Sequence, residues 1–151
     1  MKIKIEDIPS QGLHKEMSYD PQELDMEIEN HPYSLPVKFS TPITAIADIM
    51  LYDKELVVEV VVRYKLKMVC SRCLEEFEVG FEKRFIFNYN TRGIEVIDIT
   101  PDIREEIILR YPQKPLCKPD CKGLCSGCGV NLNVERCRCK RENQEVENGQ
   151  S

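Results

Sequence analysis

The chain has 151 residues, of which 42% are hydrophobic and 31% are charged, and its formal net charge is −5. These values are typical of a globular protein of about one domain, and no apolar run reaches the roughly 20 residues of a membrane-spanning helix. The first residues, MKIKIEDIPS, lack the apolar core and cleavage site of a signal peptide, so the sequence predicts a cytoplasmic protein without membrane contact.

The N-terminal third has a weak pattern. Residues 2–5 alternate lysine and isoleucine, which predicts a short strand, and a polar, acidic stretch follows that includes His14 and His31. Both histidines lie far in sequence from every cysteine, so we expect them at the surface. In 35–50, apolar pairs are separated by Pro36 and Pro42, which predicts an edge strand or an interrupted strand.

The clearest pattern is period-2 alternation. From Leu56 to Met68 every even position is apolar, and from Phe77 to Tyr89 most odd positions are apolar. Two such segments around the sequence CSRCLE predict a long antiparallel hairpin. The first strand would be about 50 Å long if straight. We therefore expect it to bend or coil, with Gly80 as a bulge on its partner.

A third strand is predicted at 94–99, directly before a helix start. Thr100, Pro101 and Asp102 are suited to the cap, the first helical position and the first turn, and apolar residues then recur at helical spacing until Pro112. The helix is predicted over 102–111. Beyond Pro115 the hydrophobic content falls and cysteine becomes frequent.

These elements predict a mainly β fold of the α+β class. It would be an antiparallel sheet or a partly closed barrel built on the long hairpin, with one short helix and a C-terminal zinc-binding segment. Three parts are expected: a β-rich domain at 1–116, a cysteine-rich segment at 117–141 packed on the hairpin turn 70–73, and a disordered tail at 142–151.

Eight cysteines in a chain without a secretion signal favour metal binding over disulfides, because the cytosol is reducing. Two C-x-x-C pairs have the gap that brings both thiolates to one zinc ion. Gly129 follows the second pair, and its freedom to adopt positive φ lets backbone N–H groups turn towards the sulfurs. The sequence predicts one or two structural Zn²⁺ ions. The candidate ligands are Cys70, Cys73, Cys117, Cys121, Cys125, Cys128, Cys137 and Cys139.

The grouping of these ligands stays open between two arrangements. The favoured one makes the two C-x-x-C pairs, at 70–73 and 125–128, face each other as in a zinc ribbon, and leaves a second site to Cys117, Cys121, Cys137 and Cys139. The alternative combines the four cysteines of 117–128 in one local site. The hairpin pair would then join Cys137 and Cys139.

A basic block overlaps the cysteines. Residues 110–141 contain eight basic and two acidic side chains, whereas residues 1–60 contain five and twelve. This block is either a solvated face or a contact for RNA phosphates, and zinc-bound thiolates would offset part of its charge. The candidate nucleic-acid-binding residues are Lys118, Lys122, Arg136, Arg138, Lys140 and Arg141. There is no nucleotide-binding glycine loop, serine elbow or Cys-His pairing, so we expect neither an enzyme nor a small-molecule substrate.

Three segments together resemble a known family: VCSRCLEEFE, VIDITPDIREEIILRYPQKPLC and CKPDCKGLCSGCGVNLN. Over about residues 35–133 the chain is similar to the YceD family, the large ribosomal RNA subunit accumulation proteins. The resemblance implies a role in ribosome biogenesis, with precursor large-subunit ribosomal RNA or a ribosome-assembly protein as the partner. The family's cysteine motifs match Cys70, Cys73, Cys117, Cys121, Cys125 and Cys128, and some members lack one of the motifs.

Two other functions remain open from the sequence. The acidic N-terminal region, with its dense run at 20–29, would suit a protein–protein adaptor that docks a basic partner. Closely spaced thiols would also suit a redox sensor. The redox interpretation is weakened because the first C-x-x-C lies between two strands and not where a strand enters a helix.

Overall fold

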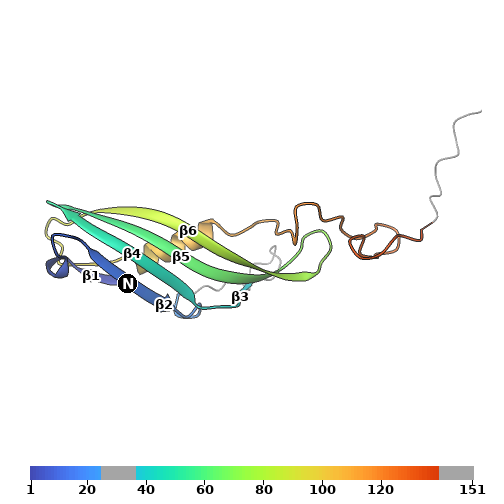
Figure 1. Cartoon of the computed structure of the whole chain (residues 1–151), viewed down its shortest axis with the longest axis horizontal. Coiled ribbons are helices and arrows are strands. Elements are labelled where there is room, and N and C mark those ends of the chain that lie inside the picture. Colours follow the sequence, from blue (N-terminus) through green and yellow to red (C-terminus); the bar gives the residue numbers. More distant parts are fainter. Residues whose placement is uncertain (25–36, 140–151) are drawn as a thin grey trace, which may run out of the picture.

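A computed structural model of the chain describes residues 1–24 and 37–139. Five predicted features lie outside these described residues: His31, residues 25–29 of the acidic run 20–29, Lys140, Arg141 and the tail at 142–151. Figure 1 shows an elongated body, with a cysteine-bearing arm that continues past one end of the sheet. The elements in chain order are β1 (Lys2–Lys4), the 3₁₀ helix η1 (Ile5–Asp7), β2 (Leu13–Tyr19), β3 (Val37–Phe39), β4 (Ile43–Tyr52), β5 (Glu55–Val69), β6 (Glu76–Asn90), β7 (Val96–Asp98) and α1 (Thr100–Leu109).

The main sheet is antiparallel and open. It runs in the order β2-β4-β5-β3, with β6 also paired to β5, while β1 and β7 form a small separate sheet. The strands β2, β3 and β6 are edges within the described part of the chain. The predicted mainly β fold with one short α-helix is therefore confirmed, and of its two forms the structure has the antiparallel sheet and not a barrel.

The predicted hairpin is confirmed with its full length. β5 and β6 stay in one register from Glu55 opposite Asn90 to Val69 opposite Glu76. The bulge expected at Gly80 is wrong, because Gly80 lies directly opposite Lys65 in the unbroken ladder. That expectation assumed a compact domain. In the elongated molecule a strand of 15 residues runs along the body without a break (Figure 1).

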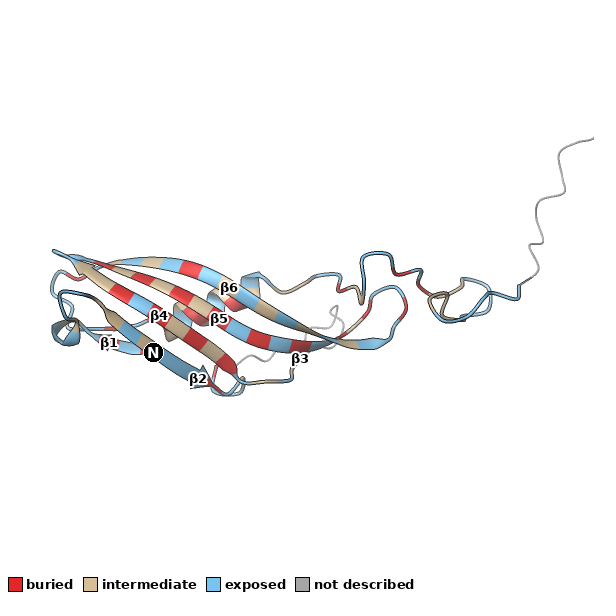
Figure 2. Cartoon of the chain, viewed as in Figure 1, coloured by how far each residue is buried: buried red, intermediate tan, exposed pale blue. Residues whose placement is uncertain are grey.

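One face of the sheet forms the core. The even positions of β5 from Leu56 to Met68 are at most 4% exposed, and Figure 2 shows their alternation with partly buried and exposed residues along the strand. The helix α1 contributes Ile103 and Ile107, both fully buried, to the same core. The opposite face carries cross-strand ion pairs such as Arg63–Glu82 at 2.6 Å. The sheet thus has one apolar and one charged face.

Some predicted boundaries need correction. The helix begins at Thr100 and not at 102, because the Asp98 carboxylate accepts the Thr100 N–H at 3.0 Å just before the first turn. It ends at Leu109. The interrupted strand at 35–50 is confirmed as β3 and β4, but β4 is not an edge, because β2 pairs along its other side. No helix in the described ranges has the length and apolarity to cross a membrane.

Candidate metal centres

The eight cysteines form two groups of four. We call Cys70, Cys73, Cys117 and Cys121 the inner cluster, and Cys125, Cys128, Cys137 and Cys139 the outer cluster. Within each cluster the four sulfur atoms lie within 4.8 Å of one another. A tetrahedral zinc site with Zn–S bonds of about 2.3 Å has S–S edges of about 3.8 Å. The donor type, number and spacing in both clusters therefore fit one tetrahedral ion each.

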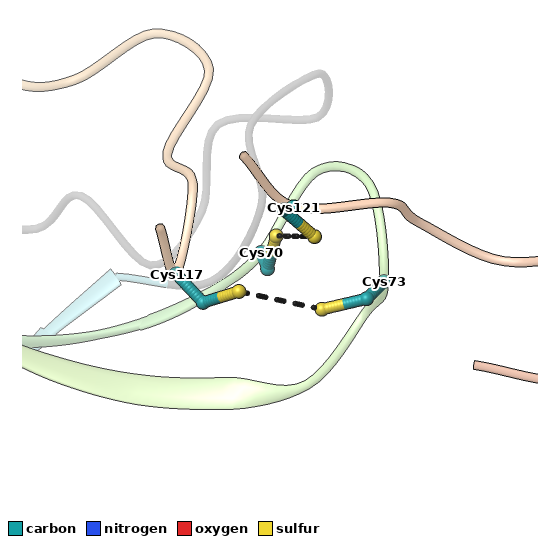
Figure 3. Close-up of side chains that lie close together, drawn as sticks. All are labelled: Cys70, Cys73, Cys117 and Cys121. Carbon is teal, nitrogen blue, oxygen red and sulfur yellow. Dashed lines mark hydrogen bonds between the residues drawn. The ribbon is translucent and has the colours of Figure 1, made fainter. Parts of the chain in front are cut away.

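The inner cluster joins the tip of the hairpin to the segment that follows α1 (Figure 3). The Sγ atoms of Cys70 and Cys121 are 3.8 Å apart, and those of Cys73 and Cys117 are 3.7 Å apart. A backbone hydrogen bond from Ser71 N–H to the Pro115 carbonyl, at 2.8 Å, brings the two segments together. Cys70, Cys73 and Cys121 are at most 4% exposed.

The outer cluster lies within the last described segment. The Cys125 Sγ is 3.1 Å from that of Cys137 and 3.9 Å from that of Cys139, and the Cys128 and Cys137 sulfurs are 3.8 Å apart. Every described residue from 125 to 139 is exposed or only partly buried. This segment has no core of its own, so burial of apolar surface cannot hold it, and a bound ion would supply the missing free energy.

Both predicted groupings of the cysteines are wrong. The chain leaving α1 passes the hairpin tip first, so Cys117 and Cys121 complete the site begun by Cys70 and Cys73. The second C-x-x-C pair lies further along the arm, where it meets cysteines only from its own segment. Each cluster therefore combines one C-x-x-C pair with the next two cysteines along the chain.

The two C-x-x-C pairs adopt the same knuckle. In each, the residue after the second cysteine has a positive φ: +60° at Leu74 and +74° at Gly129. Its N–H donates to the carbonyl of the first cysteine, from Leu74 to Cys70 at 3.0 Å and from Gly129 to Cys125 at 2.8 Å. Leucine at such a position is strained, because its Cβ crowds the backbone.

This shared geometry predicts opposite effects for two substitutions. Gly129→Ala should destabilise the outer knuckle by about 1 kcal/mol through backbone strain alone, since no atom lies within 4 Å of the added Cβ. Metal affinity of the outer cluster should fall about fivefold in chelator competition. Leu74→Gly should relieve strain at the inner knuckle and leave its affinity equal or higher. An equal loss in both variants would contradict the common turn.

The thiols of each cluster differ in acidity in the metal-free chain. Burial raises the pKa of Cys70, but backbone N–H groups, with Cys73 the strongest donor, outweigh it and lower that pKa to about 6. Burial and the neighbouring thiols raise the pKa of Cys117 to about 12. In the outer cluster, the Cys128 backbone N–H is the main cause that lowers the pKa of Cys125 to about 6, while the neighbouring thiols raise that of Cys139 to about 12.

The difference in pKa between the thiols of one cluster has an electrostatic origin. Four sulfur atoms so close together cannot all be ionised without a cation, because like charges repel. A divalent ion removes the repulsion, so metal uptake by either cluster would release protons, and affinity would fall as the pH is lowered.

Residues outside the cysteine motifs also shape the inner cluster. The Arg72 guanidinium donates to the Cys121 carbonyl at 3.1 Å, and the Asn133 side-chain amide donates to the Cys121 sulfur at 3.3 Å. Sequence reasoning missed both residues. Arg72 lies inside a C-x-x-C pair, which is a usable signal, whereas nothing in the sequence around Asn133 indicates its contact.

The predicted basic residues lie on the same arm, which we define as residues 112–139. Lys118, Lys122, Arg136 and Arg138 are all exposed, and so is Lys114. The arm carries five basic and two acidic side chains. Two ions with four thiolates each would contribute about −2 per site and leave the arm close to neutral.

His14 is at the surface as predicted, 2.6 Å from Asp48.

Comparison with known proteins places the similarity in the C-terminal half. Residues 90–148 match the model of the family described as large ribosomal RNA subunit accumulation protein YceD. A maize protein named large ribosomal RNA subunit accumulation protein YCED homolog 1, chloroplastic, is 48% identical over 48 residues, which are 31% of this chain and 16% of the maize protein. The Arabidopsis thaliana protein of the same name is 38% identical over 52 residues, 34% of this chain and 16% of that protein.

A bacterial relative shares a longer segment. An uncharacterised protein of Mycobacterium tuberculosis is 46% identical over 82 residues, 44% of this chain and 40% of the relative. The chain thus matches well under half of the length of each of these relatives. No solved structure matches the chain. The predicted resemblance to the large ribosomal RNA subunit accumulation proteins of the YceD family is confirmed, but the family match begins at residue 90 and not near 35, so it is carried by the last residue of β6, the strand β7, the helix α1 and the cysteine arm.

Proposed function

We propose that this protein is a non-catalytic ribosome biogenesis factor that supports the accumulation of large-subunit ribosomal RNA. The observation that carries the proposal is the place of the family match. Residues 90–148 contain α1, six of the eight cysteines and the whole basic arm. The part of the chain with the named likeness therefore contains the whole outer cluster, two of the four inner-cluster cysteines and the exposed basic residues of the arm.

Zinc is the metal that the clusters suit best. Four thiolates without a water, histidine or carboxylate ligand are typical of closed structural zinc sites. A closed site keeps no open position for a substrate, which agrees with a structural and not a catalytic role. In this proposal the inner ion fixes the arm to the hairpin tip, and the outer ion folds the end of the arm.

The arm would contact precursor ribosomal RNA through local contacts and not through net charge. With both ions bound its overall charge is close to zero, so long-range attraction to RNA is weak. Exposed lysines and arginines can still meet individual phosphates where the arm lies against the RNA. Four such contacts would give a slope of log K against log salt of about −3.

This proposal predicts a result for crosslinking in cells followed by sequencing of the bound RNA. Large-subunit precursor RNA should be enriched, and reversing the charge of Lys118, Lys122, Arg136 and Arg138 to glutamate should reduce the enrichment about tenfold or more. A matched control reverses four exposed cations, Lys2, Lys4, Lys54 and Arg92, which lie on and around β1 and the β4–β5 turn, away from the arm.

The control separates RNA contact from a general charge effect. Equal loss in both variants would contradict the arm as the contact. The adaptor alternative makes a different prediction: neutralising the acidic run 20–29 would remove a protein partner, and charge reversal on the arm would leave the crosslinked RNA unchanged.

A further inference from the structure

The loop that connects the two halves of the outer cluster folds back onto the inner cluster. This loop spans residues 129–136. Its Leu132 N–H donates to the Gly123 carbonyl at 2.9 Å, and Asn131 forms a β-bridge with Leu124. The loop therefore lies against 122–124, the short segment that links the last inner ligand to the first outer ligand.

Asn133 makes the contact between this loop and the inner cluster. Its Oδ1 accepts the Lys122 backbone N–H at 2.9 Å, and its Nδ2 donates to the Asn131 side-chain oxygen at 2.9 Å. These bonds fix the orientation of the amide. The same Nδ2 also donates to the Cys121 sulfur at 3.3 Å. A donor held towards a ligand sulfur stabilises the thiolate and strengthens metal binding there.

The loop that carries Asn133 is flanked by two ligands of the outer cluster. It begins after Cys128 and ends before Cys137. Besides the bonds to 122–124 and to Cys121, the loop is held by the Cys125 N–H, which donates to the Val130 carbonyl at 2.8 Å, and none of its own residues is buried. An ion in the outer cluster would tie the two ends of the loop together and so hold Asn133 in place.

We propose that the two clusters are coupled metal sites and that Asn133 is the positioning residue that couples them. Occupation of the outer cluster orders the loop, the ordered loop places the Asn133 amide on Cys121, and the inner cluster then binds its ion more tightly. Coupling free energies are reciprocal, so inner occupation strengthens the outer site by the same factor. This inference rests on the proposed metal binding and adds to it a communication between the sites.

Because the two clusters differ in burial, we expect the outer cluster to lose its ion before the inner one. The inner ligands are mostly buried beside the hairpin, whereas three of the four outer ligands are exposed. Chelators and thiol reagents would reach the outer ion first. Loss of the outer ion would then weaken metal binding at the inner cluster. Chelators or thiol reagents in solution would in this way weaken the attachment of the arm to the sheet.

The test is a zinc titration of the reduced full chain against a chromophoric chelator of known affinity. Amide NMR signals of Ser71 and Leu74 report the inner cluster, and that of Gly129 reports the outer one. In the double variant C128S/C137S, which lacks the outer site, inner affinity should fall about tenfold. Asn133→Ala should cause a similar fall with the outer cysteines intact. Val134→Ala, at a neighbouring side chain that is 79% exposed, is the control and should change nothing.

The decisive measurement is the combination of these variants. If the coupling runs through Asn133, adding Asn133→Ala to C128S/C137S should weaken the inner site no further. An inner affinity in C128S/C137S equal to that of the unaltered chain would overturn the coupling. A full further loss in the triple variant would overturn the role of Asn133. An unaltered chain that takes up no zinc at either cluster would instead overturn the proposed metal binding itself.

Discussion

Cys73→Ser should release the arm from the sheet. Serine cannot replace a thiolate as a zinc ligand, so the inner cluster would keep three sulfurs and lose most of its metal affinity. The described polar links between the hairpin tip and the arm would then be the contact between the Cys70 and Cys121 sulfurs and hydrogen bonds such as those from Ser71 and Arg72. Such bonds contribute about 1 kcal/mol each, which is small beside the roughly 10–16 kcal/mol of a structural zinc site.

Two measurements check this expectation. Zinc content by elemental analysis should fall from about two ions per chain to about one or fewer, since four thiolates bind one ion. Limited proteolysis should cut between α1 and the outer cluster, while the sheet stays resistant because its buried residues lie elsewhere, from Met1 to Ile107.

Cys128→Ser is the matched control, because Cys128 holds the same place in the second knuckle. It should lose the outer ion but keep the inner cluster's ligands, so the segment 114–121 should stay resistant to protease. An unchanged zinc content in Cys73→Ser, or cleavage that is the same in both variants, would contradict the inner cluster as the joint between arm and sheet.

The hairpin could be predicted from sequence because its signal is local and repeated. Seven consecutive even positions of β5 face one core, so period-2 alternation is complete and both strand ends are correct. β6 shows the same pattern with one exception, Lys83, whose ammonium lies 5.8 Å from the Phe81 ring on the apolar row. A charge on the inward row of an edge strand discourages pairing with another chain.

The strand β2 could not be predicted because most of its side chains are in contact with water. It is an edge, only Tyr19 among its residues is buried, and Lys15 interrupts the apolar odd positions, so its alternation is short and incomplete. Its pairing with β4 depends on long-range contact that propensity does not contain. For the same reason the sequence left open whether 35–50 forms an edge strand or an interrupted strand.

For the cysteines, the sequence predicts that they bind metal but not which of them share a site. Their number and spacing were sufficient to predict thiolate sites for one or two metal ions, because that inference needs only ligand chemistry. Which cysteines group together depends on where the chain runs after α1. There the Ser71 N–H donates to the Pro115 carbonyl at 2.8 Å and holds the chain beside the hairpin tip. Asn133 depends on two further folded contacts, so no local pattern identifies it.

Ile103→Ala should lower the free energy of unfolding of the sheet by about 2–5 kcal/mol, because it leaves a cavity where a fully buried side chain of α1 packs. Domains of this size have about 5–15 kcal/mol in total, so the variant should be marginal. Ile86→Ala, on the charged face and 62% exposed, should change stability by less than about 0.5 kcal/mol. Denaturant unfolding followed by circular dichroism measures both.

Repeating that experiment with a strong chelator separates the two sources of order in this chain. The sheet is held by the core on which α1 packs, whereas 125–139 has no buried residue among those described. Chelation should therefore leave the difference between Ile103→Ala and the unaltered chain unchanged within about 0.5 kcal/mol, since the sites are distant and share no partner. A difference that shrinks or grows on chelation would mean that metal and core stabilise one cooperative unit, and the arm would then be part of the fold and not an attachment to it.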